Sequence, residues 1–366
     1  MISNVICNSA KQGLIPQREY FDKDIANSDN TNGYYIIESN DFVYNPRKSA
    51  DAPYGPISSY QYPEAGIVSP LYLCFRAKRE INPLYFEWYF RSSAWHRYIY
   101  MSGDSGARHD RVSIKDDVFF AMPINVPSAK EQERISLFLD AIERRIETQR
   151  TLVETLKKYK RGVVRSLLSP EHCGLKEVQW QYDTIGNLGF FIKGAPLSKA
   201  DISKTGTPFI LYGELYTTYH EVITSVVRKT EAVVEQVYHS MVGDVLIPTS
   251  GETSEEISTA SCIMLPGVIL AGDLNIFRST KIDGRIMSYM LNHIVNGNIA
   301  RVAQGKSVVH VQASEISKIK ISYPDPETQI RIIKILEAIS NRIESCENEL
   351  NQLTKMRSSL LQQLFI

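Results

Sequence analysis

The sequence has few cysteines, and they form none of the patterns typical of metal sites or disulfide frameworks. No two of them have CxxC spacing, and no histidines cluster beside them. These absences argue against a zinc site or a disulfide scaffold, so we expect no metal and a reducing, cytoplasmic location. The five cysteines are Cys7, Cys74, Cys173, Cys262 and Cys346.

An excess of charge of either sign is also lacking, because 41 Lys and Arg residues balance 41 Asp and Glu residues. Non-specific polyanion binding favours strongly basic domains, although local basic loops are compatible with a neutral chain. No apolar stretch is long enough to span a bilayer, and we expect no signal peptide and no membrane partner. With 43% hydrophobic residues over 366 positions, the chain is predicted to fold into two or three domains.

Motifs for catalysis are lacking as well. There is no Asn-Pro-Pro-Tyr or Asp-Pro-Pro-Tyr segment of the kind that adenine N6-methyltransferases use, and the nearest approach, Tyr44 to Lys48, lacks the second proline. No GxGxxG follows a predicted strand, and no Walker A loop is present. No acidic cluster with a downstream lysine indicates a nuclease. We therefore expect no catalytic residues, and we expect that the chain is not an enzyme by itself.

What the sequence does contain is an internal repeat, which is the first feature to look for. Residues 142–169 align without a gap to residues 339–366 at a constant offset of 197, which takes Ile142 to Ile339. The match extends upstream, where Pro127 falls on Pro324 and Gln132 on Gln329. Chance does not readily produce a gap-free match of this length, so the chain is predicted to be built from two related halves.

Each copy predicts one long helix, the first from Lys130 to Ser169. Apolar residues recur at spacings of three and four, interrupted by Lys160 in the first copy and Arg357 in the second. Sustained seams of this kind indicate coiled-coil packing, and the first helix would be about 60 Å long at 1.5 Å per residue. We expect the two helices to pack against each other; the alternative is that each lies on its own domain. The predicted packing residues are Ile135, Leu139, Ile142, Ile146, Leu156, Ile332, Leu336, Ile339, Ile343, Leu350 and Leu353.

Weaker similarity joins the segments that precede the two helices. Residues 66–76 resemble residues 268–278, and the loops 45–49 and 249–254 occupy corresponding positions. Both halves show short runs of β-branched and aromatic residues broken by Gly, Pro, Asn and Asp, which predict strands and turns. Residues 180–208 have no counterpart in the first half. Either the first domain is shortened, or the start codon lies downstream of an ancestral one.

These parts, in this order, resemble the specificity subunit of type I restriction–modification systems. The resemblance is carried by the twin helices, by PINVPSAKEQ and ISYPDPETQ before them, and by details such as IKGAPLSKADIS and AGDLNIFR. It covers essentially the whole chain and implies an α+β fold: two α/β target-recognition domains separated by two long antiparallel coiled-coil helices with pseudo-two-fold symmetry. The expected parts are an N-terminally shortened first domain (1–126), a central spacer helix (127–172), a second domain (173–323) and a C-terminal spacer helix (324–366).

The resemblance also implies a function in defence against foreign DNA. Each domain would read half of a bipartite target in double-stranded DNA, and the helices would set the gap, because half-site spacing follows protein geometry. Two methylase subunits would bind the chain, and restriction and translocase subunits would join through them. These partners would hold S-adenosylmethionine, ATP and Mg²⁺, with no cofactor in this chain. The alternative is a solitary homologue, an interaction or decoy protein that docks on methylase subunits without full DNA specificity.

Polar and cationic residues in glycine-containing loops are the candidate DNA contacts, since arginine can pair with guanine or hold phosphate and glutamine can pair with adenine. A solvated loop is the alternative for each, and a lone histidine is as often structural. Lys193, beside Gly194, is expected in a turn. The cations between Lys157 and Arg165 are expected on a solvated helix face. The candidates are Arg47, Lys48, Arg108, His109, Arg111, Lys193, Thr249, Ser250, Thr253, Gln304, Lys306, Ser307 and His310.

Overall fold

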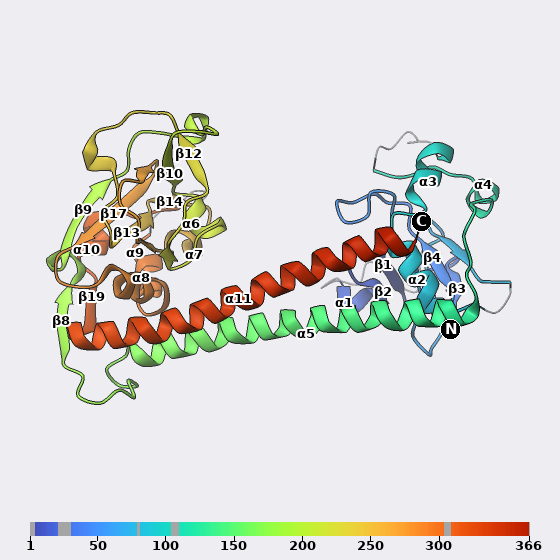
Figure 1. Cartoon of the computed structure of the whole chain (residues 1–366), viewed down its shortest axis with the longest axis horizontal. Coiled ribbons are helices and arrows are strands. Elements are labelled where there is room, and N and C mark those ends of the chain that lie inside the picture. The colour runs from blue at the N-terminus through green and yellow to red at the C-terminus, as the bar shows by residue number, and fades with distance from the viewer. Residues whose placement is uncertain (1–3, 21–30, 79–80, 104–109, 304–308, 366) are drawn as a thin grey trace. The chain divides into compact units, whose positions relative to one another are not determined.

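The computed structural model describes residues 4–20, 31–78, 81–103, 110–303 and 309–365. Two compact units make up the chain. Unit 1 comprises residues 1–151 and 347–366, and unit 2 comprises residues 152–346. Their helices and strands are labelled in Figure 1.

Unit 1 is built on short antiparallel strands. Its pairs and sheet are β1 (Ile6–Ser9) with β2 (Gly13–Pro16), β3 (Tyr35–Ile37) with β6 (Gly66–Val68), and β4 (Phe42–Tyr44) between β5 (Ile57–Ser59) and β7 (Leu73–Phe75). Side chains alternate along β4. Phe42 and Tyr44 enter one core and Val43 enters another, because successive side chains of a strand point to opposite faces. Both faces of the β5-β4-β7 sheet are therefore covered.

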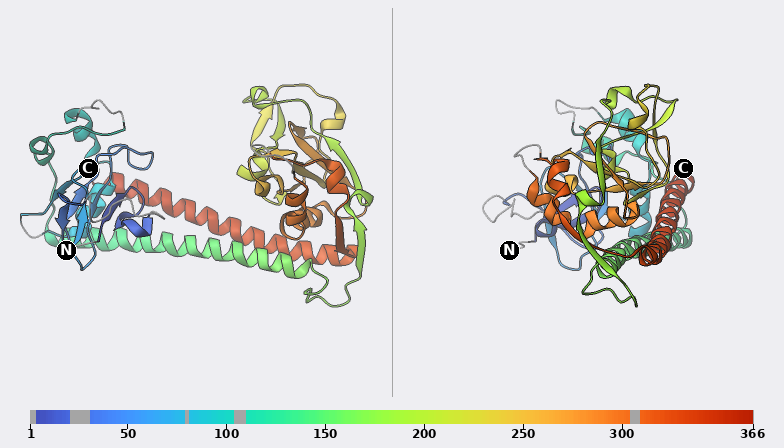
Figure 2. Two further views of the ribbon diagram at one scale, coloured as in Figure 1. Left: turned by 180° about the vertical axis from the view of Figure 1, so that it is seen from behind. Right: turned by 90° about the vertical axis from the view of Figure 1, so that its left-hand side faces the viewer.

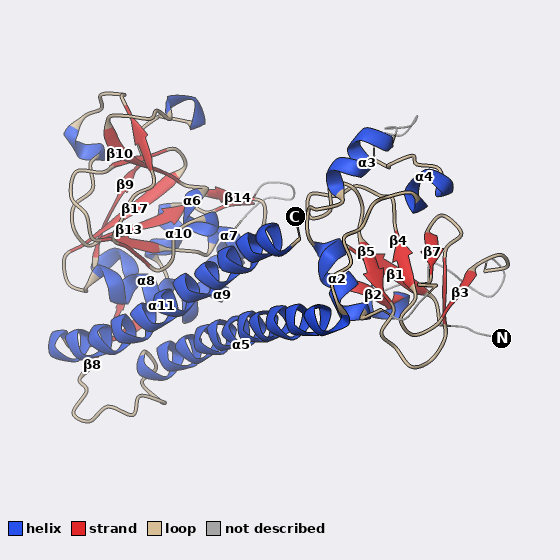
Figure 3. Cartoon of the chain, turned by 45° about the vertical axis from the view of Figure 1, so that its right-hand side comes forward, coloured by secondary structure: helices blue, strands red, loops and turns tan. Residues whose placement is uncertain are grey.

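Aromatic side chains dominate the larger core of unit 1, which includes Trp88, Trp95 and Phe119. Helix α2 lies against β5 and supplies several of them (Figure 3). It begins after Asn82, whose side chain accepts hydrogen bonds from Leu84 N and Tyr85 N, which satisfies backbone donors that a helix leaves unpaired. The short helices of this unit are α1 (Gln17–Tyr20), α2 (Pro83–Arg91), α3 (His96–Ser102) and α4 (Asp116–Phe120).

Unit 2 has a larger central sheet with the strand order β11-β15-β13-β17-β9. Its strands are β11 (Val222–Ile223), β15 (Ser261–Ile263), β13 (Asp244–Pro248), β17 (Leu274–Ser279) and β9 (Gly189–Lys193). A second sheet has the order β12 (Arg228–Thr230), β10 (Thr207–Leu211) and β16 (Ile269–Ala271). Two further pairs are β19 (Lys320–Pro324) with β8 (Trp180–Thr184), and β14 (Ser250–Gly251) with β18 (Val309–His310).

Helix α8 packs on β15 and β13 of the central sheet in unit 2, as α2 packs on β5 in unit 1. Five of its seven buried residues join the main core of the unit. The helices are α6 (Glu214–Thr217), α7 (Ser254–Ile257), α8 (Gly284–His293), α9 (Asn296–Val302) and α10 (Ala313–Ser317). Single 3-10 turns occur at η1 (Ile185–Asn187), η2 (Lys199–Asp201) and η3 (Gln236–Tyr238).

The two units repeat the same sheet, because β5-β4-β7 in unit 1 corresponds to β15-β13-β17 in unit 2. An ion pair between an arginine and a buried aspartate recurs at the same place. Arg76 donates through Nε and Nη2 to Asp41, and Arg278 donates through Nε and Nη2 to Asp244, with both Nη2 contacts at 2.7 Å. Paired parallel hydrogen bonds between arginine and a carboxylate are strong and directional. The similarity expected between residues 66–76 and 268–278 is therefore confirmed.

Residues 180–208 provide strands that have no counterpart in the described part of unit 1. Strand β8 pairs with β19, the segment that leads into the second long helix. Residues 123–127 occupy the corresponding place in unit 1 and form no strand. A strand needs a neighbour to satisfy its backbone groups, so this difference follows from the segment that the first half lacks.

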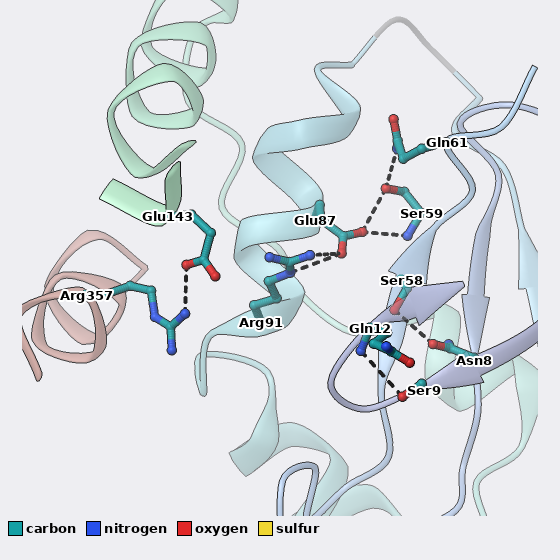
Figure 4. Close-up of polar contacts among 10 residues, drawn as sticks. All are labelled: Asn8, Ser9, Gln12, Ser58, Ser59, Gln61, Glu87, Arg91, Glu143 and Arg357. Atoms are coloured by element: carbon teal, nitrogen blue, oxygen red, sulfur yellow. Dashed lines mark hydrogen bonds and ion pairs between the residues drawn. The ribbon is translucent and has the colours of Figure 1, made fainter. Parts of the chain in front are cut away.

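The long helices are α5 (Ala129–Leu167) and α11 (Pro326–Leu364), each of 39 residues. Helix α5 begins one residue before the predicted start and ends two before the predicted end. In unit 1 the start of α5 and the end of α11 run side by side (Figure 2). Glu143 pairs with Arg357, and Gln149 bonds to Glu349, so the two segments are antiparallel. Arg357, which interrupts the apolar seam, thus bonds to the facing helix (Figure 4).

The predicted packing residues are all buried or half-buried. Those buried are Leu139, Ile142, Ile146, Ile332, Leu336 and Ile343, and those half-buried are Ile135, Leu156, Ile339, Leu350 and Leu353. Leu139 also belongs to the aromatic core of unit 1, and Ile332 and Leu336 belong to the main core of unit 2. The sequence left two alternatives, that the long helices pack on each other or that each packs on its own domain. The structure has contacts of both kinds.

Lys160 corrects one expectation, since its side chain is only 12% exposed and does not face solvent. Its Nζ lies 2.8 Å from a carboxylate oxygen of Glu221, whose other oxygen contacts His293, and it lies over the ring of Tyr289. Burial opposes ionisation of Glu221, but the hydrogen bond from His293 and the charge of Lys160 outweigh it and hold its pKa well below the usual range. The break in the first apolar seam is thus an ion pair within unit 2.

Candidate nucleic-acid interface

A polar, cationic hollow of about 810 Å³ lies in unit 1. Four cationic side chains line it, those of Lys11, Arg47, Lys48 and Arg111, with Asp51 as an acidic member. Asn8 and Asn45 also line it. We call these four cations and two asparagines the first candidate surface. Grouped cations attract phosphate, and arginine can also pair with base edges.

Backbone pairing brings Arg47 and Arg111 together, although they are far apart in sequence. The two residues form an antiparallel bridge. It is flanked by hydrogen bonds from Val112 N to Pro46 O at 2.9 Å and from Lys48 N to Asp110 O at 2.8 Å. Arg47 Nε lies 3.7 Å from Asp110 Oδ2, but both side chains are more than half exposed, so this ion pair contributes little stability. The Arg47 side chain is therefore available to a ligand.

The asparagines hold the loop that carries Arg47. Asn8 is buried, donates through Nδ2 to Val43 O at 2.7 Å, and accepts from Ser58 Oγ at 2.9 Å (Figure 4). Asn45 Nδ2 donates to Asn8 O, and Arg47 N donates to Asn45 Oδ1. Gly55, at φ +83°, lies against the backbone of Asn45, and a Cβ at this position would lie 2.1 Å from Asn45 O. Only glycine permits that approach.

Arg111 stands between two hollows, since it also lines a second one of about 720 Å³ with Tyr72 and Leu71. Its Nε atom is buried and has no hydrogen-bond partner among the described residues. Burial raises the pKa of Tyr72, and the nearby charge of Arg111 partly offsets that rise. A buried donor without an acceptor is costly, which sets Arg111 apart from the exposed Arg47.

Three of the candidates predicted in the first half, Arg47, Lys48 and Arg111, are thus brought together. The other two, Arg108 and His109, lie outside the described residues. Sequence reasoning missed Lys11 and the two asparagines. Lys11 lies in the tight turn between β1 and β2, where Ser9 Oγ accepts from Lys11 N and Gln12 N. Figure 4 shows the contact between Ser9 and Gln12. That polar turn between two apolar runs was the available signal.

A second candidate surface in unit 2 consists of Lys193, Thr249, Ser250 and His310. Ser250 pairs with His310 in the short β14·β18 ladder. Val311 N donates to Thr249 O at 3.0 Å, and Thr249 N donates to Asp273 O at 2.8 Å. Ser250 Oγ donates to Asp273 Oδ2 at 2.9 Å. These bonds fix the loop after β13 against the segment that contains His310.

Lys193 joins this surface through Asn275, a buried residue of the neighbouring strand. Its Nζ donates to Asn275 Oδ1 at 2.8 Å, and Asn275 Nδ2 donates to Val311 O at 3.3 Å. Lys193 is the last residue of β9, so its expected place in a turn is wrong. The reason is that residues 189–193 pair with β17, and Gly194 passes so close to Gly272 that a Cβ would lie 2.8 Å from Gly272 O.

Thr253 is exposed, and its side chain accepts a hydrogen bond from Glu256 N at 3.2 Å. This bond is typical of a residue that begins a helix, and it gives Thr253 a structural contact beside the second candidate surface. Three further candidates, Gln304, Lys306 and Ser307, lie outside the described residues.

The two candidate surfaces occupy equivalent places in the repeated fold. In each unit, the loop after the central strand pairs with a segment beyond a short helix, as Arg47 with Arg111 and as Ser250 with His310. The side chains differ, because unit 1 has two arginines where unit 2 has a buried serine and an exposed histidine. One backbone arrangement therefore carries two unlike sets of hydrogen-bonding groups.

Among the described residues, no group of three or more His, Cys, Asp and Glu side chains is placed to hold a metal ion. The helices of the described part include none with the length and apolar character needed to cross a membrane.

Residues 177–355 match the family model of the type I restriction modification DNA specificity domain. A protein provisionally assigned as the type I restriction enzyme MjaX specificity subunit of Methanocaldococcus jannaschii is 23% identical over 302 residues, covering 78% of this chain and 67% of that protein. A solved chain from work on complex assembly and conformational transition of the type I R-M system has a TM-score of 0.60 at 16% identity, covering 90% of this chain and 82% of that one.

The type I restriction–modification S subunit from M. genitalium has a TM-score of 0.55 at 16% identity, covering 94% of this chain and 87% of that one. At such identities these structures show a shared fold. The family resemblance noted from the sequence and the α+β fold class are confirmed by these matches.

Proposed function

Because residues 177–355 match the family model of the type I restriction modification DNA specificity domain, we propose that the chain is the subunit that selects the DNA sequence for such an enzyme. Each unit reads half of a bipartite target in double-stranded DNA through its candidate surface. The chain itself is non-catalytic and supplies sequence selection and partner binding.

The equivalence of the two candidate surfaces is the observation that supports this proposal. The same backbone pairing joins Arg47 to Arg111 and Ser250 to His310, while the side chains differ. Hydrogen bonds to phosphate position a protein on DNA, and hydrogen bonds to base edges specify the sequence. Equal backbone geometry with unlike side chains suits the reading of two different half-targets.

Methylation and cleavage belong to partner subunits in this proposal. Two methylase subunits bind the chain, consistent with its two related halves, and they hold S-adenosylmethionine and flip the target base out of the duplex. Restriction subunits join through the methylase subunits and use ATP and Mg²⁺. None of these cofactors is assigned to residues of this chain.

Selection from random-sequence duplex DNA, with the full chain alone and with a methylase subunit, tests the proposal. The expected result is a motif of two short blocks separated by a fixed gap. Methylase binding with no selected sequence would contradict it and would indicate a decoy or interaction protein instead.

A further inference from the structure

Two glutamines at equivalent places make the same contacts at the start of the two long helices. Gln132 donates through Nε2 to Pro127 O at 2.8 Å and accepts through Oε1 from Asn82 N at 3.2 Å. Gln329 donates to Pro324 O at 2.8 Å and accepts from Asp283 N at 2.9 Å. Their residues are 5% and 3% exposed, respectively. A buried amide is tolerated when both its donor and its acceptor are bonded.

The residues that donate to these glutamines begin α2 and α8. Asn82 Oδ1 accepts from Leu84 N at 3.0 Å, and Asp283 Oδ1 accepts from Arg285 N at 2.9 Å. One residue therefore both caps the short helix and bonds to the long helix. Each glutamine thereby fixes the first turn of α2 or α8 relative to the first turn of α5 or α11.

Both short helices are in turn bonded to the sheet of their unit. Glu87 Oε2 accepts from Ser59 N at 2.6 Å and from Ser59 Oγ at 2.7 Å (Figure 4). Asn292 Nδ2 donates to Ala260 O at 2.7 Å, and Ala260 N donates to Asn292 Oδ1 at 3.1 Å. Ser59 belongs to β5 and Ala260 directly precedes β15.

The bonded strands lead to the candidate surfaces. β5 pairs with β4, which runs directly into the loop that carries Arg47. β15 pairs with β13, which runs directly into Thr249 and Ser250. In each unit a continuous series of contacts thus joins the long helix, through one glutamine, to the candidate surface.

We propose that Gln132 and Gln329 are positioning residues that fix the orientation of each candidate surface on its own long helix and so limit the gap allowed between two half-targets. The inference rests on the proposed function. The residues around the glutamines differ between the units. The second residue of the short helix is Leu84 in α2 and Arg285 in α8, and the residue that bonds this helix to the sheet is Glu87 in unit 1 and Asn292 in unit 2. The two glutamine hydrogen bonds are the same in both, which points to a shared requirement for geometry.

The test uses the full chain and a series of duplexes that carry the selected motif with its gap unchanged, shortened or lengthened by one base pair. The measured quantity is the ratio of affinities for the correct and altered gaps. Gln132→Met and Gln329→Met keep the side-chain volume and remove both hydrogen bonds, so each is expected to reduce this ratio by about three- to tenfold. Gln132→Asn, a shorter amide, is expected to reduce it in the same direction and is less disruptive to folding.

Gln149→Met is the matched control. Gln149 is a buried glutamine of the same helix that bonds to Glu349 and not to a residue that begins α2, so its variant should keep the wild-type ratio. Equal loss of affinity for all gaps in the Gln132 and Gln329 variants would reduce these residues to a structural role and overturn the inference. A wild-type chain that selects no bipartite motif would instead remove the proposed function, and the inference with it.

Discussion

At the scale of single residues, Arg111 differs from the other cations of the first candidate surface. Arg47 is largely exposed beside Asp110, whereas the Nε atom of Arg111 is buried without a partner among the described residues. An exposed cation suits phosphate, which attracts it from any direction. A half-buried guanidinium has fewer orientations than an exposed one, and this suits the two acceptors of guanine because that contact depends on orientation.

Substitutions of Arg111 should therefore distinguish its contribution to base discrimination from the contribution of its charge to DNA affinity. Arg111→Lys keeps the charge, so it should keep most of the salt dependence of DNA binding but lose about 1–3 kcal/mol of discrimination at one base pair of the first half-target. Arg111→Met should lose both. Binding to matched and singly altered duplexes at several salt concentrations measures the two effects. Lys355→Ala removes a charge from α11 as a control, and equal discrimination in wild type and Arg111→Lys would refute the assignment.

Asp325 directly precedes α11, and the pH dependence of stability tests whether its hydrogen bonds stabilise the start of that helix. Its carboxylate accepts from Thr328 N, Gln179 N and Thr328 Oγ1, and these hydrogen bonds lower its pKa to about 2. A carboxyl group whose pKa falls on folding stabilises the protein above its unfolded pKa of about 4. Asp325→Asn should therefore be less stable than wild type at pH 7, and the difference should disappear as the pH falls from about 4 to about 2. Urea unfolding across this range measures it, and a difference independent of pH would contradict the account.

Candidate residues could be predicted from sequence where local chemistry marks them, and their neighbours could not. Arg47 and Arg111 stood out in loops that contain Gly, Pro or Ser, but only the folded backbone pairs them. Lys160 was expected to face solvent because nothing in a helical pattern reveals Glu221, which comes from a distant segment. Lys193 was assigned to a turn because Gly194 follows it, whereas close approach to Gly272 is the reason for that glycine.

At the scale of elements, the first long helix was predicted within two residues at each end because its signal is periodic and repeated. The sequence predicted that short strands and turns occur, but not which strands pair, since pairing depends on contacts distant in sequence. The segment 180–208 was recognised as unmatched, but not as the source of β8 and β9.

One contact between elements is present in unit 2 and lacks an equivalent in unit 1. Arg285, in the first turn of α8, lies 2.8 Å from Glu337 of α11. The corresponding pair in unit 1 is Leu84 and Asp140, which line a hollow of about 270 Å³. Leu84→Arg should create the missing ion pair and raise the free energy of unfolding by about 0.2–1 kcal/mol. A double-mutant cycle with Asp140→Asn measures the coupling, and zero coupling energy would show that no pair forms.

At the scale of the whole molecule, the two long helices are expected to set the distance between half-targets. Seven residues of coiled-coil sequence inserted after Thr151 in α5 and after Cys346 in α11 preserve the apolar seams and add about 10 Å of helix. The selected gap should grow by about three base pairs, at about 3.4 Å per base pair, while both blocks keep their sequence. Selection from random duplex DNA gives the result, and an unchanged gap would exclude this role for the helices.

Unit 1 is assembled from both ends of the chain, and this affects how the protein is made. Phe365 packs its ring 5.4 Å from that of Tyr85 and 5.9 Å from that of Tyr89, within the aromatic core. A ribosome makes these tyrosines well before it makes the phenylalanine, which follows unit 2 in the sequence. The core of unit 1 can therefore close only after the whole of unit 2 has been synthesised, and a stop codon before Phe365 would damage the part that is translated first.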